Sequence, residues 1–592
     1  MNSHKTAKCL SKGRHFLCPP TTPNFPDNEP KMMKKTVFFK TLLLATATLA
    51  AQTFDADSAK AFFDASPDLA KKSRGYFAEA EAEYAPNAAP AYEKLVVAKY
   101  LSALAKYGKS ASPELRTELL GNFALLDEFV STLSPDDDAV RVFEILEKIR
   151  AAAPDKFEKY PKLAIAIAVV FDTPPPADWP HGQVSEKLLP RKPRDPVERF
   201  SKIVEMRERG KFLIPTEKLS VEELKYLVPS TASDDDAEWA QKSVSVSLTN
   251  IPKLYPSISY DHGRLSRKEF DWNGDDYRLK TIKVRGGICT DQAYFTSEVA
   301  KARGVPAFIF SGAGSDGFHA WVGYMQRPNS WNFGVGRYEG ARFVTGKTLD
   351  PQTWKTATDH SLESLREGFR NGAKYKASEM HETFAKHFFD KKEFAKSLAC
   401  AKAAVASDAR NADAWNTIID SLGKLERPNA EICTAYENAI RAFSKYPDTD
   451  ADFRRRLVKI YRDSNNPNAA RKLSTSIILK SKSLRPDIAM EFARAELEID
   501  ISDGSADKLV STYKRLLSTF KNDSAVAIDG ITIPIVNALL KTDKYRATRD
   551  IMKTTRLVLK PAKDSLILPV LNNIDTQLDT IIPKLDKQKS GD

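Results

Sequence analysis

One cysteine in the chain stands in a setting that favours chemistry. Residues 285–295 read RGGICTDQAYF, and the two glycines allow a tight turn into a predicted helix whose first residues include Cys289. A thiol at a helix N-terminus lies at the positive end of the helix dipole, which favours the thiolate. The sequence therefore predicts that Cys289 is a nucleophile if a base lies nearby.

His319 is the candidate base. Residues 304–307 (GVPA) end the predicted helix and lead into a strand, and a glycine-rich turn then precedes His319 at the head of a β-rich run. This order of elements allows the imidazole to lie beside the start of the helix. A thiolate–imidazolium pair is the expected result.

Taken together, these segments resemble the transglutaminase-like superfamily. The shared pattern is a G-G-x-C-x-x-x-A helix, a G-[IV]-P-A segment and a G-x-H-A-W-V strand, and it covers about residues 250–360. The resemblance implies the papain-like fold of transglutaminases, peptidases and amide hydrolases. It also implies that Cys289 is the nucleophile, and that His319 is the base that then protonates the leaving amine.

The third member of the triad departs from the family pattern. The family places an Asp on the next strand to orient the imidazole, but that position falls near Val335 in this chain. Asp350 has the right local sequence, before a proline and after an apparent insertion at 336–346. We therefore expect Asp350 to orient His319. Asn332 is the reserve, because an amide also holds one imidazole tautomer.

Other polar residues give weaker signals. His262 and His360 lie in polar surroundings and are predicted to be surface residues, and no spacing of His and Cys indicates zinc. The acidic run 234–236 is more typical of a capped helix start than of a calcium site. Residues 312–315 (GAGS) fit a lip beside the histidine better than a phosphate loop. Neither a metal nor a cofactor is predicted.

The first 51 residues are expected to be a leader. Residues 1–31 show no apolar periodicity and are interpreted as a misplaced start or an unstructured extension. Residues 32–51 join a MMKK start to a short apolar run and an alanine-rich end, the pattern of a secretory signal peptide. The alternative is an uncleaved membrane anchor. The expected location is the periplasm or cell envelope of a bacterium, with no stable membrane span after cleavage.

Removal of this leader changes the charge and the cysteine count. Residues 1–51 carry 8 of the 90 Lys and Arg and 2 of the 78 Asp and Glu, which leaves 82 and 76 and a net charge of +6. Such a small surplus, without a basic stripe, argues against nucleic-acid binding. Cys289, Cys400 and Cys433 remain, and an odd number leaves at least one thiol free.

The rest of the chain divides by composition. Residues 52–171 are predicted to be a helical domain, 172–196 a Pro-rich linker or long connecting loop, 197–365 the transglutaminase-like domain, and 375–585 a helical repeat domain. The predicted fold is an α+β papain-like transglutaminase core flanked by an all-α N-terminal bundle and a C-terminal helical repeat (TPR-like) domain.

Apolar periodicity locates several elements within these domains. Helices are predicted at 89–107, 113–131, 138–152 and 289–303, and strands at 307–310, 319–325, 330–334 and 342–349. Residues 403–415 and 439–451 align as copies about 36 residues apart, with a third copy at 513–527, and this period resembles tetratricopeptide-type repeats. The alternative is an irregular helical domain.

Two classes of function fit these patterns. The first is an exported thiol enzyme that cleaves or transfers amide bonds of a protein or peptide substrate through a Cys289 acyl-enzyme, with hydrolysis favoured by analogy. The second is a catalytically inactive papain-like domain in a scaffold whose C-terminal repeats bind a protein partner. The presence of both Cys289 and His319 in their motifs favours the enzyme.

Overall fold

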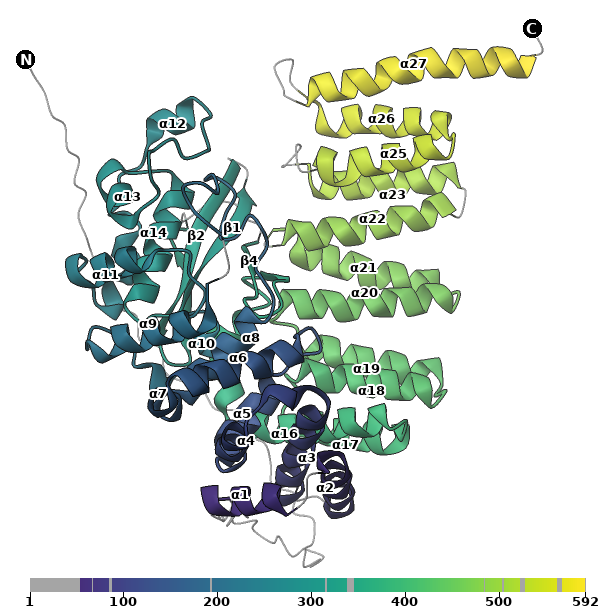
Figure 1. Cartoon of the computed structure of the whole chain (residues 1–592). Helices are drawn as coiled ribbons and strands as arrows, with labels where there is room; N and C mark the ends of the chain where they lie inside the picture. Colours follow the sequence, from purple (N-terminus) through teal and green to yellow (C-terminus); the bar gives the residue numbers. More distant parts are fainter. Residues whose placement is uncertain are drawn as a thin grey trace, which may run out of the picture. The chain divides into compact units, whose positions relative to one another are not determined.

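The computed structural model describes residues 54–65, 68–84, 88–191, 194–314, 317–337, 345–483, 485–502, 505–521, 527–561 and 567–590. The predicted extension 1–31 and signal peptide 32–51 lie outside these ranges. The described part of the chain is mostly helical and contains a small five-stranded antiparallel sheet (Figure 1).

The first described segment is helical, as predicted. Helix α3 has the predicted bounds, whereas the predicted helix 113–131 is two helices, because Gly121 and Asn122 interrupt it. The Asn122 side chain accepts a hydrogen bond from the N–H of Leu125 and so caps the second of them. The elements are α1 (Ala56–Asp64), α2 (Leu69–Glu83), α3 (Ala89–Tyr107), η1 (Gly108–Ser110), α4 (Pro113–Leu120), α5 (Phe123–Thr132), α6 (Ala139–Ala152), α7 (Pro154–Lys159) and α8 (Pro161–Phe171).

The Pro-rich connection after α8 is packed against its surroundings. Its described residues form no helix or strand, yet Val184 and Leu189 are both buried. The Trp179 ring meets the Trp354 ring edge-on, with centroids 5.4 Å apart. Apolar side chains placed between the prolines therefore anchor this connection to the core.

Short helices surround the sheet in the middle of the chain. They are α9 (Pro196–Glu208), η2 (Thr216–Lys218), α10 (Val221–Leu224), α11 (Asp234–Ser243), η3 (Leu248–Leu254), α12 (His262–Ser266), α13 (Leu279–Arg285) and the longer α14 (Cys289–Ala302). Helix α14 lies beside β1 and β2 (Figure 1), and all its residues are buried. This burial explains why its sequence shows little amphipathic pattern.

The sheet has the strand order β3-β2-β1-β4-β5. Its strands are β1 (Ala307–Gly314), β2 (Gly317–Arg327), β3 (Ser330–Val335), β4 (Lys347–Leu349) and β5 (Thr356–Thr358). The first three confirm the predicted strands and extend them. Of the strand predicted at 342–349, residues 342–344 lie outside the described ranges and 347–349 form β4.

An aromatic layer covers one face of the sheet. Phe310 lies opposite Trp321 across the β1–β2 pair, and their rings are 5.7 Å apart. Phe308, Trp331 and Phe333 pack against one another in the same layer. The layer forms because paired residues in an antiparallel sheet point to the same side.

Antiparallel helices follow the sheet and stack on one another (Figure 1). The segments 403–415 and 439–451 each span the end of one helix, a turn and the start of the next. The third copy, 513–527, lies partly outside the described ranges. The elements are α15 (Glu363–Glu367), η4 (Phe369–Asn371), α16 (Ala373–Asp390), α17 (Phe394–Ser407), α18 (Ala412–Lys424), α19 (Asn429–Ala442), α20 (Pro447–Asp463), α21 (Pro467–Ser481), α22 (Pro486–Ser502), α23 (Ala506–Thr519), the π-helical turn η5 (Ile528–Thr532), α25 (Ile533–Lys541), α26 (Tyr545–Leu559) and α27 (Leu568–Ser590).

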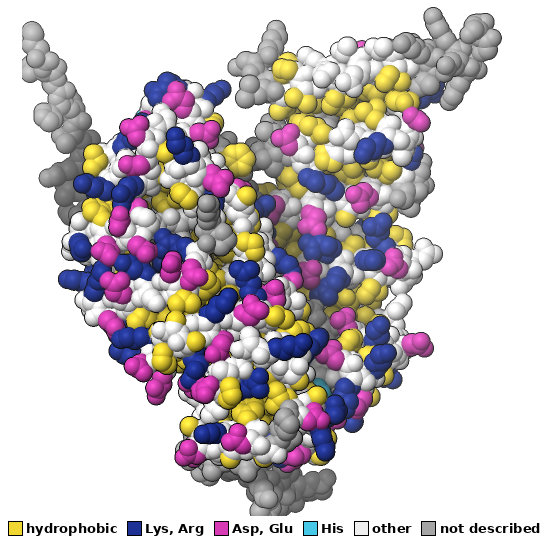
Figure 2. Space-filling model, viewed as in Figure 1, with side chains coloured by type: hydrophobic (Ala, Val, Ile, Leu, Met, Phe, Trp, Pro, Cys, Tyr) yellow, Lys and Arg dark blue, Asp and Glu magenta, His cyan; other side chains and the backbone are white. Residues whose placement is uncertain are grey.

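Two clusters of buried apolar side chains support these elements. The larger extends from Ala59 to Leu457 and includes the N-terminal helices, the sheet and the first helices after it. The smaller extends from Ala451 to Leu578. On the face shown in Figure 2, basic and acidic side chains are interspersed, as expected for a solvated surface of mixed sign.

Candidate active site

Two glycines bring the chain into α14. Gly286 has a φ of 83°, and a Cβ there would lie 2.4 Å from the carbonyl oxygen of Ser259. The N–H of Gly287 donates to that same oxygen over 2.9 Å. Only glycine fits this left-handed turn and close approach, so the local sequence places Cys289 at the first position of the helix.

The first turn of α14 is held by a buried carboxylate. Asp291 accepts hydrogen bonds from the N–H of Ile288, the hydroxyl of Tyr277 and the guanidinium of Arg264, each over 2.8 Å. The Arg264 and Asp291 side chains are only 2% and 1% exposed. This network fixes the helix start, and with it the direction of the Cys289 side chain.

His319 lies on β2 opposite Gly312 of β1 and is buried. Its Nε2 atom lies 2.7 Å from the carbonyl oxygen of Gly336. A carbonyl only accepts hydrogen bonds, so Nε2 is the protonated nitrogen, and in the neutral ring Nδ1 carries the lone pair. The Trp321 ring stacks on the imidazole with centroids 6.0 Å apart, which fixes the plane of the ring.

The structure brings the main chains of the two predicted catalytic residues together. The Tyr255 hydroxyl contacts the carbonyl oxygens of Cys289 and of Ala320, the residue after His319, over 3.3 and 2.7 Å. The start of α14 is thus joined to β2 at the position of His319.

Cys289 is a buried free thiol, 9% exposed. Burial raises the pKa of the Cys289 thiol, whereas hydrogen bonds from Ala320 and Thr290 lower it in part and the Asp291 carboxylate adds to the increase. The thiol is therefore protonated at neutral pH. Desolvation of the thiol therefore opposes the thiolate that the helix dipole favours.

Asp350 does not take the place predicted for it. It follows β4, which pairs with β1 and is separated from β2 by that strand. Its carboxylate accepts hydrogen bonds from the N–H groups of Gln352 and Thr353, over 3.0 and 2.8 Å, and so caps its own turn. Its negative charge also stabilises the positive charge of the buried Lys225 ammonium. The prediction that Asp350 orients His319 is wrong, because β4 carries it to another part of the sheet.

Asn332 is also engaged elsewhere. It lies opposite Tyr324 in the β2–β3 pair, several residues along the sheet from His319, and its side-chain oxygen accepts the N–H of Gly334 over 2.8 Å. The group that holds the imidazole is instead the main-chain carbonyl of Gly336, next to Val335, where the family pattern places the acid. A carbonyl leaves no trace in the sequence, and this is why sequence reasoning missed it.

The residues that gave weaker signals of function in the sequence lie in different parts of the structure. His262 is exposed, as predicted, whereas His360 is half-buried and lines a cavity. Residues 234–236 form the first turn of α11, where Ser233 caps the helix. Gly312 pairs with His319 and thus lies beside it, as the predicted lip requires.

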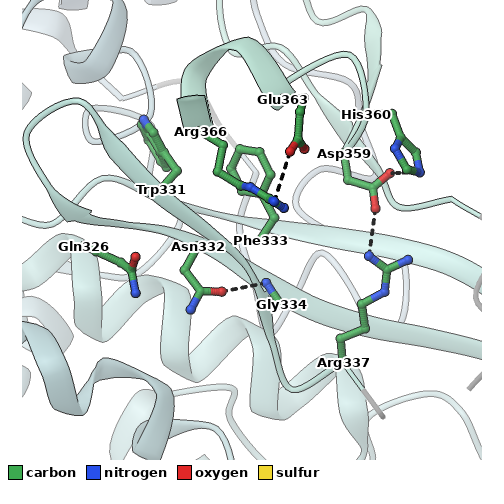
Figure 3. Close-up of a pocket in the computed structure, with 10 residues that line it drawn as sticks. All are labelled: Gln326, Trp331, Asn332, Phe333, Gly334, Arg337, Asp359, His360, Glu363 and Arg366. Atoms are coloured by element: carbon green, nitrogen blue, oxygen red, sulfur yellow. Dashed lines mark hydrogen bonds and ion pairs between the residues drawn. The ribbon is translucent and has the colours of Figure 1, made fainter. Parts of the chain in front are cut away.

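A cavity of about 300 Å³ lies between β3 and the segment around α15 (Figure 3). Arg337 follows Gly336 and forms an ion pair with Asp359 over 2.9 Å at the edge of this cavity. The cavity is lined by Gln326, Trp331, Asn332, Phe333, Gly334, Arg337, Asp359, His360, Glu363 and Arg366. Its two aromatic and several charged side chains come from β2, β3 and the segment around α15.

Among the described residues, no group of three or more His, Cys, Asp or Glu side chains is placed to hold a metal ion. None of the helices in the described ranges is long and apolar enough to span a membrane.

No family model matches the chain. No curated protein matches it either. The function is therefore inferred from the residues themselves and from the geometry of the site.

Proposed function

We propose that this chain is a transglutaminase-like thiol enzyme that transfers the acyl group of an amide bond, with Cys289 as nucleophile and His319 as base. One observation carries the proposal: the Gly336 carbonyl holds Nε2 of His319, while the Tyr255 hydroxyl joins the carbonyl oxygen of the next residue, Ala320, to that of Cys289. The imidazole thus has the tautomer that a general base needs, on the strand joined to the start of α14.

The proposed reaction has two steps. Nδ1 of His319 takes the thiol proton as the Cys289 sulfur attacks the carbonyl carbon of the amide, and the negative charge moves to the carbonyl oxygen. The C–N bond then breaks as His319 returns that proton to the amine, which leaves a thioester on Cys289. Water or a second amine then attacks the thioester carbon and gives its proton to His319. The C–S bond breaks, which releases an acid or a new amide, and His319 returns the proton to the sulfur.

The start of α14 supplies an oxyanion donor in this scheme. The first N–H groups of a helix have no partner within the helix, and the N–H of Cys289 is at the first position. Such groups stabilise a developing oxyanion where water is excluded. The protonated resting thiol means that the nucleophile forms by proton transfer when a substrate is bound.

We also propose that the substrate is a protein or peptide outside the cytoplasm. The family resemblance supports the kind of substrate, and the predicted signal peptide supports the location. Hydrolysis is favoured over transfer to an amine by analogy with relatives of this fold. The analogy concerns fold, so the test below distinguishes the two reactions.

A second function is favoured by the burial of Cys289. A thiol that is 9% exposed and has a raised pKa also suits an inactive papain-like domain. In that case the stacked helices from α16 onward, as tetratricopeptide-type repeats, would serve to bind a protein partner.

The experiment is incubation of the full chain with a mixed peptide library, followed by mass spectrometry. New amino termini indicate a peptidase, conversion of Gln to Glu indicates an amidase, and Gln–Lys cross-links indicate a transglutaminase. We expect one of these products with wild type and with Cys433→Ala, and none with Cys289→Ala. Product formation that survives Cys289→Ala would overturn the proposal, and so would the absence of all three products.

A further inference from the structure

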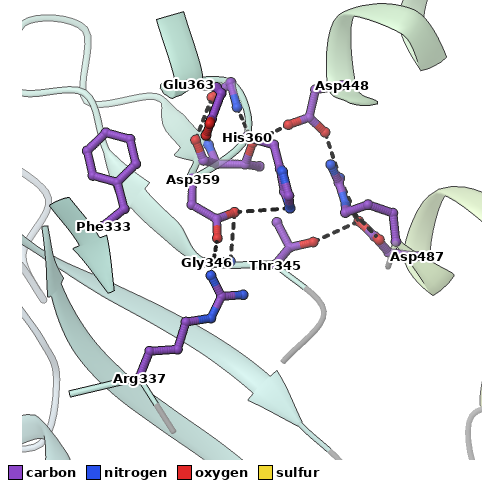
Figure 4. Close-up of polar contacts among 12 residues, drawn as sticks. Phe333, Arg337, Thr345, Gly346, Asp359, His360, Glu363, Asp448 and Asp487 are labelled. Carbon is purple, nitrogen blue, oxygen red and sulfur yellow. Dashed lines mark hydrogen bonds and ion pairs between the residues drawn. The ribbon is translucent and has the colours of Figure 1, made fainter. Parts of the chain in front are cut away.

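Asp359 holds both ends of the connection between β3 and β4. Its Oδ2 atom lies 2.9 Å from Nη1 of Arg337, and its Oδ1 atom accepts the N–H of Gly346 over 3.1 Å. Its own N–H donates to the carbonyl oxygen of Gly346 over 2.9 Å. Figure 4 shows these contacts converging on one carboxylate, which is buried. A single side chain thus fixes the chain before and after this connection.

Arg337 transmits that position to His319 by two routes. It follows Gly336 directly, so the ion pair constrains the carbonyl oxygen that holds Nε2 of the imidazole. Its guanidinium also lies over the Trp321 ring, 5.0 Å from the centroid, and that ring both stacks on His319 and packs against Phe310. Displacement of Arg337 would therefore loosen the hydrogen bond to the imidazole and remove one support of the ring that stacks on it.

Two helices after the sheet support the same region. Asp487 of α22 accepts the hydroxyl of Thr345 over 3.3 Å, next to Gly346. Asp448 of α20 accepts the hydroxyl of Thr358, next to Asp359. Arg485 forms ion pairs with both Asp448 and Asp487. These contacts hold the chain next to Asp359 and next to Gly346.

We propose that Asp359 is the positioning residue for His319, acting through Arg337 and the Gly336 carbonyl. This inference rests on the proposed function for its catalytic meaning. It assigns a positioning role to a buried acid that acts on the imidazole through Arg337 and the Gly336 carbonyl. A buried carboxylate aligns the arginine, the arginine aligns the carbonyl, and the carbonyl selects the Nε2–H tautomer.

The test uses Asp359→Asn, which keeps an acceptor for the N–H of Gly346 but removes the charge that Arg337 needs. Arg337→Gln is the second variant, because that side chain is 30% exposed and its loss is less harmful to folding. Asp350→Asn is the matched control, since this acid caps the turn after β4 and lies on the far side of β1 from His319. The chain has 8 histidines, so the spectrum of His319→Gln is needed to identify the imidazole signal of His319 by its absence.

The first measurement is the tautomer of His319 by ¹⁵N–¹H correlation of histidine-labelled full chain, at a pH where the imidazole is neutral. We expect the Nε2–H form in wild type and in Asp350→Asn, and a mixture of tautomers in Asp359→Asn and Arg337→Gln. The second measurement is the rate of acetylation of Cys289 by p-nitrophenyl acetate. We expect this rate to fall at least about tenfold in Asp359→Asn and in Arg337→Gln.

The outcomes separate this inference from the proposed function. If His319 keeps the Nε2–H tautomer in folded Asp359→Asn and in folded Arg337→Gln, the proposed role of Asp359 is overturned. A tautomer that shifts in the variants, in a protein whose wild-type Cys289 does not react, supports the role of Asp359 and overturns the enzyme. A shift accompanied by slower acetylation supports both.

Discussion

The Nε2 atom of His319 donates a hydrogen bond to the carbonyl oxygen of Gly336, 2.7 Å away, and this contact stands where a carboxylate was expected. Because a main-chain carbonyl is neutral, it orients the imidazole without stabilising a positive charge on it as an acid would. It thus suits a base that is neutral at rest beside a protonated thiol.

Gly336 should tolerate no side chain. Its φ is 85°, and a Cβ there would lie 2.5 Å from the ring of Tyr255. Gly336→Ala should therefore lower the free energy of unfolding by about 2–4 kcal/mol and slow any Cys289 reaction that depends on His319. Urea unfolding checks the first effect. Gly334→Ala is the control: its nearest neighbour would be 3.6 Å away, so its stability should change by less than about 1 kcal/mol. Equal effects of the two substitutions would contradict the account.

Tyr255→Phe should loosen the junction between α14 and β2. The change removes the hydroxyl that contacts the carbonyl oxygens of Ala320 and Cys289 and leaves buried acceptors short of a donor. We expect a loss of about 1–3 kcal/mol in unfolding free energy together with slower acetylation of Cys289. A variant as stable and as reactive as wild type would show that the hydroxyl has no part in the site.

The buried ion pair under Cys289 should be sensitive to loss of either partner. Asp291→Asn leaves the Arg264 guanidinium buried without its counter-charge, at a cost of about 3–5 kcal/mol. The comparison is Glu269→Gln, which breaks the exposed pair with Arg267 and should cost less than about 1 kcal/mol. Chemical denaturation of the two variants measures the difference, and similar values would argue that water reaches the Arg264–Asp291 pair.

Alkylation of Cys289 should show the effect of burial once the base is removed. Burial raises the thiol pKa, and the thiolate is the reactive form. In His319→Ala, the rate of reaction with iodoacetamide should therefore rise with pH only above the ordinary thiol value of about 8.5. Peptide mass spectrometry against pH gives this profile. A midpoint below that value would mean that another group stabilises the thiolate.

The same shift links the thiol to stability. The folded pKa lies above the unfolded value, so the unfolded chain loses this proton first as the pH rises. The contribution of Cys289 to stability is thus fully present below about pH 8.5 and declines as the pH approaches the folded value. Unfolding of wild type and Cys289→Ser at several pH values should reveal the difference, and parallel profiles would rule out a buried neutral thiol.

Local pattern was enough to predict the elements that carry the site. The glycines before Cys289 and the proline segment after α14 determine where the helix starts and stops, and alternation of apolar residues locates β1 to β3. His319 is brought to the start of α14 because a β-hairpin joins β1 to β2.

The partners of the histidine could not be predicted in the same way. Asp350 has the expected neighbours in sequence, but β4 pairs with β1, and strand order is not visible in a local pattern. Gly336 acts through its main chain, which has the same chemistry at every residue. Asp359 and Arg337 are 22 positions apart in the chain, so only the folded structure shows the pair.

Acetylation of Cys289 by p-nitrophenyl acetate at neutral pH, read by peptide mass spectrometry for wild type and His319→Ala, tests the central claim most directly. The account predicts that Cys289 reacts at least about tenfold faster than the free thiol of Cys433 in the same chain, although it is more buried. It also predicts that His319→Ala abolishes this advantage and leaves Cys433 unchanged. A Cys289 that reacts no faster than Cys433, with or without His319, would contradict the enzyme and favour the binding scaffold.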